Sequence, residues 1–242
     1  LPIWHEKTET ANRLRGRIES VLDWATFNKL RQGENPARWK GHLEHSLARP
    51  SKVAKVVHHA ALPYQEIAAF MADLRKRQGV APRAIEFLIM TAVRSGEVRG
   101  ASWPEIDLDQ RTWTIPAERM KMEREHRVAL SDAAIAMLKS MPRVEGCDYI
   151  FPGARQTRPM SDMSLTAVLR RMGRNDITVH GFRSTFRDWA AEATNFPHEL
   201  AEMALAHVVS NKVEAAYRRG DMLEKRFAMM NDWSGYIMKL GA

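Results

Sequence analysis

The chain has 242 residues, of which 45% are hydrophobic and 27% are charged, which is enough for one large globular domain, or for one domain and part of another. Its formal net charge of +8 favours a polyanionic partner, most commonly nucleic acid, although many basic proteins bind no polyanion. A single cysteine, Cys147, excludes an intramolecular disulfide and a thiolate metal cage, and no uncharged apolar run approaches the roughly 20 residues that span a bilayer.

The amino-terminal residues bear on where the protein works. His5, Glu6, Lys7 and Glu9 occupy the positions where a signal peptide would have its apolar core. We therefore expect no membrane association and a cytoplasmic location. A chain that begins at Leu1 rather than at Met also suggests a fragment of a longer protein.

Residues 1–49 are expected to form a separate part of the chain. Apolar residues recur at helical spacing from Thr8 to about Phe27, and Gly, Asn and Pro residues then break the pattern. The polar stretch from Gly41 to Val56 contains Pro50 and several basic residues and is typical of a linker. We place a domain boundary near Pro50.

Two amphipathic helices are predicted after this boundary. Pro63 can open the first helix, and Gly79 follows it as a stop signal. Pro82 opens the second, an apolar helix that runs into Arg94.

The middle of the chain predicts a small antiparallel sheet. Thr112–Ile115 and Arg127–Leu130 have the composition of short strands, and the basic segment Glu118–His126 between them would form the tip of a hairpin. Ser131 or Asp132 is placed to cap the next helix.

The rest of the chain is predicted to be largely helical. A short strand at 149–151 comes first, and helices follow over residues 165–172, 180–193, 197–206, 212–218 and 223–240. The expected fold is therefore mainly α with one small antiparallel β-sheet, an α+β class. The sequence contains no internal repeat and no glycine-rich phosphate loop.

Two arginines stand where a phosphate could be bound. In His180-Gly-Phe-Arg183 the outer residues share one helix face, so an imidazole and a guanidinium could converge on one phosphate. Arg94 ends an apolar helix, and Glu97 is suited to hold it in place. Taken alone, the first pattern is usually a solvated helix face, and Arg94 could simply interact with the helix dipole.

Three further residues could take part in proton transfer or nucleophilic attack. Lys121 lies at the predicted hairpin tip, where an exposed lysine is ordinary but a mobile tip could also carry a proton donor over bound DNA. His207 could equally be a hydrogen-bonded core histidine. Tyr217 stands before two arginines, and a phenol, whose ordinary pKa is about 10, needs such cations and a base to react near neutral pH.

The order of these six residues resembles that of the tyrosine recombinase family. An arginine, a lysine on a hairpin, His-x-x-Arg, a histidine and a tyrosine near the carboxyl terminus follow one another in its members. From about Pro50 onward the chain is most similar to integrases of satellite phages, prophages and genomic islands, in residues 97–107, 115–122, 126–131 and 180–183. The resemblance implies the integrase catalytic-domain fold for residues 50–242, and the closing part of a truncated helical core-binding domain plus a linker for residues 1–49.

The resemblance also implies how the phosphate would be attacked. Tyr217 would attack the scissile phosphate to give a 3′-phosphotyrosine and a free 5′-hydroxyl, while Arg94 and Arg183 clamp the non-bridging oxygens. Glu97 matches an acidic position that supports the first arginine. The chain departs from the family at Thr91-Ala-Val-Arg94, where the family often has a Thr-Gly-x-Arg turn.

The remaining roles concern protons. By the same resemblance Lys121 would protonate the leaving 5′-oxygen, His180 would assist proton transfer from the tyrosine, and His207 would donate a hydrogen bond to the phosphate. Neither a metal ion nor another cofactor is expected, because fixed cations would take the place of Mg²⁺.

The expected activity is site-specific DNA recombination, the integration or excision of a mobile element. The implied partners are double-stranded DNA with an attachment-site core and other copies of the chain in a tetrameric synapse, in bacterial cytoplasm and at the nucleoid during action. The apolar stripe of the helix expected within residues 221–240 could pack in the core or dock on a neighbouring protomer.

Three other functions fit parts of the sequence. A type IB topoisomerase uses the same chemistry, but nothing here resembles its larger clamp domains. A non-catalytic DNA-binding or accessory module would need only a basic surface, and the intact set of six residues argues against it. A metal-dependent nuclease would need acidic residues in ligand spacing near His180 or His207, and none are found.

Overall fold

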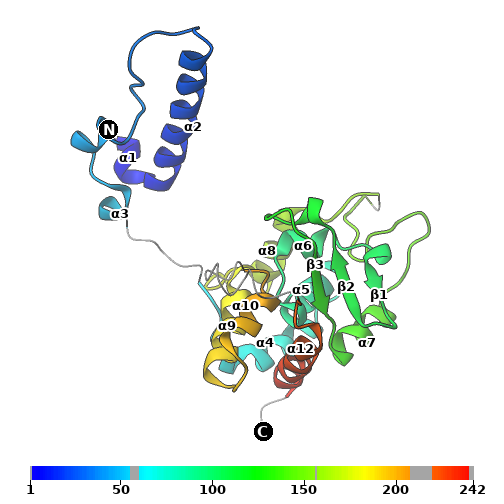
Figure 1. Cartoon of the computed structure of the whole chain (residues 1–242). Helices are drawn as coiled ribbons and strands as arrows, with labels where there is room; N and C mark the ends of the chain where they lie inside the picture. Colours follow the sequence, from blue (N-terminus) through cyan, green and yellow to red (C-terminus); the bar gives the residue numbers. More distant parts are fainter. Residues whose placement is uncertain (1, 55–59, 156, 208–219, 240–242) are drawn as a thin grey trace. The chain divides into compact units, whose positions relative to one another are not determined.

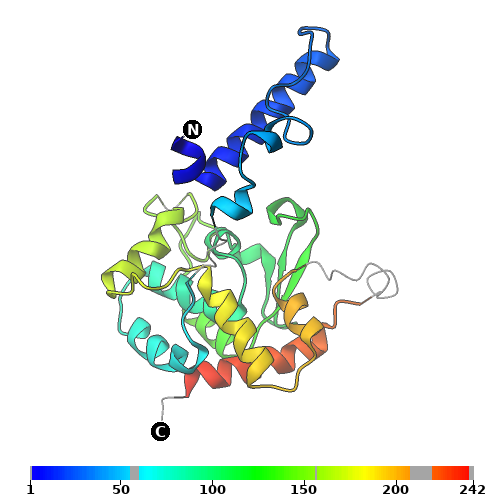
Figure 2. The same cartoon turned by 90° about the vertical axis from the view of Figure 1, so that its left-hand side faces the viewer.

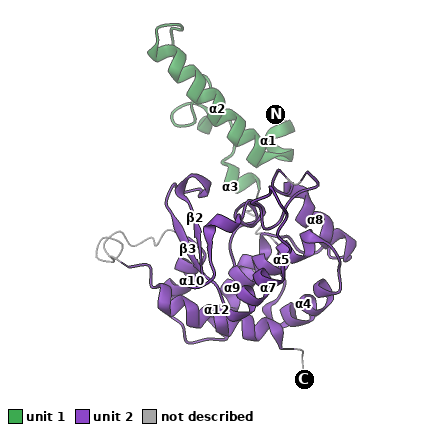
Figure 3. Ribbon diagram, turned by 90° about the vertical axis from the view of Figure 1, so that its right-hand side faces the viewer, with its two compact units in different colours: residues 1–58 green, residues 59–242 purple. Residues whose placement is uncertain are grey.

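The chain, shown in Figure 1 as a computed structural model, is described at residues 2–54, 60–155, 157–207 and 220–239. It contains two compact units, residues 1–58 and residues 59–242 (Figure 3). The division falls later than the boundary predicted near Pro50. Pro50 begins a short helix, α3 (Pro50–Val53), which packs against α2 (Thr8–Phe27) within the first unit.

The first unit is closed by the segment that the sequence predicts to be a linker. Trp4, on α1 (Pro2–Glu6), is buried; its Nε1 donates to the Ala48 carbonyl at 2.9 Å, and its ring stacks on Trp39 with centroids 5.7 Å apart. A 3₁₀ turn, Leu43–His45, lies in the same stretch. The stretch predicted to be a linker, residues 41–56, thus includes this turn and α3, and it contacts α1 through the Ala48 carbonyl.

One face of α2 is uncovered within the described residues. Leu14, Ile18 and Val21 recur at helical spacing, as predicted, yet their exposed fractions are 48%, 45% and 63%. The spacing predicts the helix correctly, but the shared face is not buried in the first unit.

The second unit is mainly helical with a small antiparallel sheet, which confirms the predicted fold class. The sheet has the order β1-β2-β3, with β1 (Ile106–Asp107), β2 (Thr112–Ile115) and β3 (His126–Ala129). Strand β1 was not predicted, because two residues leave no alternation to detect. The predicted strand at 149–151 is wrong: Tyr149 forms only an isolated bridge to Ser102.

The helices of this unit surround a core built around the apolar helix α5. They are α4 (Ile67–Arg75), α5 (Val80–Thr91), α6 (Ser95–Arg99), α7 (Asp132–Ser140), α8 (Asp162–Arg171), α9 (Gly181–Glu192), α10 (His198–Ala204) and α12 (Leu223–Met238). The described residues of this unit also contain 3₁₀ turns at Tyr64–Glu66, Trp103–Glu105 and Ala117–Arg119. The predicted cap of α7 is present, because the Ser131 hydroxyl accepts from the Ala134 N–H. In the described parts of the chain, no helix has the length and apolarity needed to cross a membrane.

Helix α5 ends before Arg94, in contrast to the prediction that it runs into this residue. The helix stops at Thr91, and Ala92 adopts a left-handed conformation with φ of 53°. A left-handed residue ends a helix and reverses the chain. Arg94 therefore stands at the start of α6 instead of the end of α5.

The carboxyl-terminal helix α12 packs within its own unit. It contacts α4, α5, α7 and β3, and Figure 2 shows it (red) beside α9 and α10. The fully buried Trp233 donates through Nε1 to the Ile89 carbonyl at 2.7 Å, and its ring lies 4.9 Å from that of Trp189. Of the two positions considered for its apolar stripe, the structure shows the core position. The helix predicted over 212–218 lies outside the described residues.

A substitution of Gly181 tests the packing at the start of α9. A Cβ added at Gly181 would clash with the Ala60 carbonyl oxygen and would lie 2.9 Å from the Ala61 Cα, so one of the two backbones must shift. We expect Gly181→Ala to lower the free energy of unfolding by about 1–3 kcal/mol, as overpacking does. Urea unfolding measures this change.

The control for this experiment is Gly235→Ala, in the interior of α12. A Cβ at Gly235 meets no atom within 4 Å, and alanine is the better helix former, so stability should rise by up to about 1 kcal/mol. Equal effects of the two substitutions would contradict the close approach at Gly181.

Candidate active site

The Arg183 guanidinium lies at the centre of the candidate site. It lies in the first turn of helix α9, and its exposed fraction is 4%. Its Nη1 donates to the Ala92 carbonyl at 2.6 Å, and its Nη2 donates to the Leu205 carbonyl at 2.7 Å. Since these carbonyls follow α5 and α10, one side chain of α9 joins the ends of two other helices.

Arg94 approaches the same place from the start of α6. Its Nη2 lies 3.4 Å from the Ala206 carbonyl. The buried Glu97 carboxylate accepts the Arg94 backbone N–H at 2.7 Å and lies 3.0 Å from Arg94 Nη1. The supporting contact predicted for Glu97 is therefore present.

The guanidinium groups of Arg94 and Arg183 repel each other electrostatically. Burial, followed by repulsion from Arg94, lowers the pKa of Arg183 to about 10, although Glu97 and Glu202 act in the opposite direction. Arg183 therefore remains protonated at neutral pH.

His207 reaches Arg183 through the turn that ends α10. Ala206 has a φ of 49°, and the His207 N–H donates to the Glu202 carbonyl at 2.9 Å, so the chain folds back over the helix end. The His207 ring then lies with Nε2 2.9 Å from Arg183 Nη2 and Nδ1 2.7 Å from Glu202 Oε2. The sequence analysis missed Glu202, because residues five apart do not share a helix face and only this turn brings them together.

The other three predicted residues are placed less directly. Lys121 lies in the exposed turn between β2 and β3, and its ammonium group makes no ion pair with any residue that the structure describes. His180 precedes α9, and its carbonyl accepts the Arg183 N–H at 3.1 Å. Tyr217 lies outside the described residues.

Arg119, two residues before Lys121, fixes the base of this hairpin to the site. Its Nη2 donates to the Glu97 carbonyl at 2.5 Å, and its Nη1 pairs with Glu105. The hairpin is therefore anchored beside the carboxylate that holds Arg94, while Lys121 stands at its exposed end.

His126 and Arg226 are two further residues that sequence reasoning missed. His126 opens β3, and its Nε2 is buried without a hydrogen-bond partner in the described part of the chain. The Arg226 side chain of α12 is buried, lies 3.0 Å from Asp221 Oδ2 and donates to the Arg127 carbonyl. His126 begins one of the stretches that resemble the family but was given no role there, and only the packing of α12 on β3 brings it near Arg226.

The surroundings keep His126 neutral. Burial, followed by the charge of Arg226, lowers its pKa to about 4. Arg183 and Arg94 act in the same direction, and the Ala204 carbonyl opposes them. His126 therefore adds no positive charge to the arginine pair near neutral pH.

The gathered groups suit an oxyanion. Arg94, Arg183 and His207 offer nitrogen atoms from three separate elements within one hydrogen-bonded cluster, and a guanidinium fork matches two oxygens of a phosphate. Over the described ranges, no three His, Cys, Asp or Glu side chains come together in a way that could hold a metal ion. The catalytic roles expected of these residues remain predictions.

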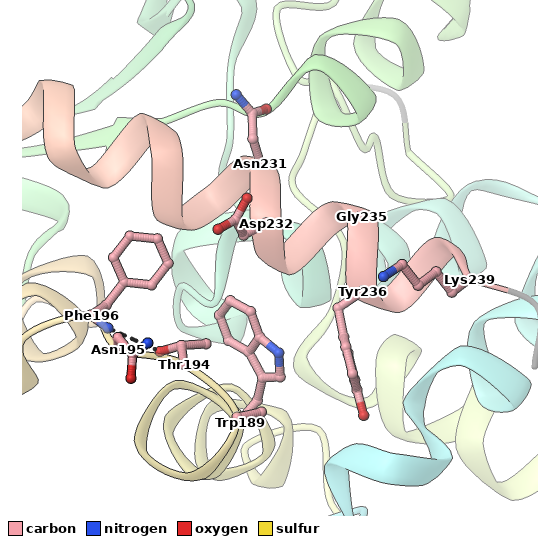
Figure 4. Close-up of a pocket in the computed structure, with 10 residues that line it drawn as sticks. Trp189, Thr194, Asn195, Phe196, Asn231, Asp232, Gly235, Tyr236 and Lys239 are labelled. Atoms are coloured by element: carbon pink, nitrogen blue, oxygen red, sulfur yellow. Dashed lines mark hydrogen bonds between the residues drawn. The ribbon is translucent and has the colours of Figure 1, made fainter.

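A separate hollow of about 560 Å³ lies between the end of α9 and α12 (Figure 4). Its lining includes Trp189, Phe196, Asp232, Tyr236 and Lys239. None of the predicted site residues lines it, so it is not part of the candidate active site.

The low pKa of His126 predicts a specific loss of stability in acid. Below pH 6.5 the unfolded chain takes up a proton that the folded chain refuses down to about pH 4, so stability falls as the pH decreases through this window. The shift corresponds to about 3 kcal/mol. Between pH 7 and pH 4 the parent should therefore lose about 3 kcal/mol more of its free energy of unfolding than His126→Gln loses. Urea unfolding of both proteins at the two pH values measures this difference.

His198→Gln, at an exposed position of the same unit, is the matched control and should behave as the parent does. A parent-like pH dependence in His126→Gln would show that folding does not lower the pKa of His126.

Two family models match the chain. The Phage integrase family matches residues 61–224, and the Phage integrase central domain matches residues 2–42. The first match alone covers more than half of the chain.

Curated relatives agree with these matches. The integrase of Enterobacteria phage P4 is 32% identical over 251 aligned residues, which cover 96% of this chain and 55% of the relative. Prophage integrase IntZ of Escherichia coli (strain K12) is 34% identical over 232 residues, covering 95% and 56%. Prophage integrase IntA of the same organism is 41% identical over 152 residues, covering 62% and 37%. The chain thus spans about half the length, or less, of these relatives.

Solved structures share the fold. A lambda integrase dimer bound to a COC′ core site superposes with a TM-score of 0.60 at 17% identity, over 89% of this chain and 60% of that one. The Tn1549 transposon integrase in complex with circular intermediate DNA gives a TM-score of 0.55 at 14% identity, over 87% and 79%. These likenesses show the fold, and the family model matched over residues 61–224 shows that the chain belongs to the phage integrase family.

Proposed function

We propose that this chain is the catalytic part of a tyrosine recombinase that integrates or excises a mobile DNA element. The observation that carries the proposal is the meeting of Arg94, Arg183 and His207 in one cluster, with Glu97 behind the first arginine. Such a cluster fits a phosphodiester, because its donors are held in place before the substrate arrives. Tyr217, ten residues after His207, supplies the nucleophile.

The reaction is a transesterification. The Tyr217 phenol oxygen forms a bond to the scissile phosphorus, and the bond from phosphorus to the 5′-oxygen breaks. The phenol proton leaves with assistance from His180, and Lys121 gives a proton to the 5′-oxygen. Rejoining reverses these steps with the 5′-hydroxyl of another strand, so no energy-rich cofactor is consumed.

The fixed cations lower the barrier by stabilising charge. Arg94 and Arg183 contact the non-bridging oxygens, on which negative charge accumulates in the transition state, and His207 donates to the same phosphate. Glu97 keeps the first guanidinium in place through its contact at 3.0 Å. Lys121, at the exposed end of the hairpin, completes the site when DNA lies beneath it.

Related structures support a DNA substrate and assembly of several copies. Lambda integrase has been solved as a dimer bound to a core site and as a tetramer bound to a Holliday junction. By analogy, this chain acts on double-stranded attachment-site DNA in the bacterial cytoplasm, with other protomers in a tetrameric synapse. The buried face of α12 already packs in the core, so contacts between protomers would use other surfaces.

Formation of a covalent adduct tests the nucleophile. With a nicked suicide substrate that bears the attachment-site core, the parent should form a protein–DNA adduct visible as a slower band on denaturing gels. Tyr217→Phe should form none, because it lacks the attacking oxygen. Tyr149→Phe and Tyr236→Phe are the controls and should form adduct as the parent does. An adduct that survives Tyr217→Phe would refute the assignment.

The salt dependence of binding tests the partner. Each phosphate that the protein neutralises adds roughly −0.9 to the slope of log affinity against log salt concentration. We expect a steep negative slope for binding to duplex DNA, measured by fluorescence anisotropy between about 50 and 200 mM salt. A flat response would argue against DNA as the partner of this basic chain.

A further inference from the structure

Both ring nitrogens of His207 are engaged by charged side chains. On one side the Glu202 carboxylate lies 2.7 Å from Nδ1, and on the other the Arg183 guanidinium lies 2.9 Å from Nε2. The ring is therefore held between an obligate acceptor and an obligate donor.

These two neighbours require the same tautomer of the neutral ring. A carboxylate can only accept a hydrogen bond, so Nδ1 must carry the proton. A guanidinium can only donate, so Nε2 must present its lone pair to Arg183. The neutral ring cannot donate to a phosphate oxygen from Nε2 in this arrangement. It gains that ability only when the ring takes up its second proton, which binds at Nε2.

We propose that Glu202 is a positioning residue of the active site: it fixes the His207 ring with Nε2 toward Arg183 and stabilises the doubly protonated ring that donates to the scissile phosphate. The proposal rests on the proposed function, since it assumes that Arg183 and His207 bind this phosphate. It assigns Glu202 no contact with the substrate.

Glu202 is itself held in its charged form. Arg187, one turn after Arg183 on α9, donates through Nε to Glu202 Oε1 at 2.5 Å, which leaves Oε2 for His207. Burial raises the pKa of Glu202, but the hydrogen bonds from Arg187 and His207 outweigh it and bring the pKa below its ordinary value. The carboxylate therefore keeps its negative charge at every pH at which the enzyme would work.

The other charged groups around the pair come from three elements. Arg183 and Arg187 face it from α9, and His198 on α10 has its Nε2 3.9 Å from Glu202 Oε1. Arg94 approaches from the start of α6 through the Ala206 carbonyl. In the described chain Glu202 is thus the negative group in direct contact with His207, amid several positive ones.

The direct readout is the tautomer of His207. Ring ¹⁵N chemical shifts of the 242-residue chain, recorded at pH 8.5, should show His207 protonated at Nδ1 in the parent. In Glu202→Gln only Arg183 still favours this tautomer, because a side-chain amide can donate as well as accept, so the fraction of the Nε2-protonated tautomer should rise above that of the parent. A fraction equal to that of the parent would show that Arg183 alone fixes the ring and would overturn the positioning role of Glu202, whatever the protein does to DNA.

The functional readout is the pH profile of adduct formation on the nicked substrate. In Glu202→Gln the doubly protonated ring lacks its anionic partner, so the rate should begin to fall at a lower pH than in the parent, and on the alkaline side it should be about tenfold slower. On the acid side the two rates should approach each other. A slower rate with an unchanged pH profile would indicate a merely structural role and contradict the proposal.

Two further variants complete the design. Glu192→Gln removes the same charge from the exposed end of α9 and should leave both the tautomer and the pH profile as in the parent. Glu202→Asp keeps the charge and should restore much of the parent profile, which covers the case in which Glu202→Gln folds poorly. If the parent forms no adduct, the proposed function fails, while the tautomer measurement still decides the role of Glu202.

Discussion

The packing of three helices and the position of the His207 ring depend on one guanidinium that is buried among backbone carbonyls. An unpaired charge inside a protein costs several kcal/mol, so Arg183 can be buried only where hydrogen-bond acceptors surround it. Its acceptors are the carbonyls of Ala92 and Leu205, which lie together only when α5, α9 and α10 are packed. The same side chain presents Nη2 to His207, so the residue that joins three helices also holds the His207 ring.

Two positive groups at close range need compensation before any phosphate arrives. The Glu97 carboxylate compensates the charge of Arg94 and also accepts the Arg94 backbone N–H. The Glu202 carboxylate lies near Arg183 and bonds to the side chains of Arg187 and His207. His126 adds no further charge because its environment keeps it neutral. The cluster thus holds its donors in place in the free protein, which is what stabilisation of a phosphate requires.

The periodicity of apolar residues, together with helix-capping and helix-breaking residues, was sufficient to predict most elements of the second unit. The helix after Pro63, the hairpin strands and the Ser131 cap follow from local signals. The short strand β1 and the break after Thr91 do not, because a two-residue strand has no period and a left-handed alanine has no sequence signal. The contact between the predicted linker and the first helix could not be predicted either, because Trp4 and Ala48 meet only through the tertiary fold.

The candidate site divides along the same line. The sequence was sufficient to predict those site residues that belong to motifs resembling a known family, namely Arg94, Glu97, Arg183 and His207. Glu202 contacts His207 only through the turn at Ala206, and Arg226 meets Arg127 only through the packing of α12 on the sheet. Contacts made by turns and by packing between distant segments leave no pattern in one sequence.

The uncovered face of α2 has a consequence for how readily this helix unfolds locally. The buried residues of the first unit are few, chiefly Trp4, Thr8, Ala11, Asn35 and Ala37, while Leu14, Ile18 and Val21 face outward. So little apolar burial offsets only a small part of the chain entropy lost on ordering a helix of 20 residues. The backbone amides of α2 therefore exchange with solvent through local opening long before those of α5, whose residues lie in the main core.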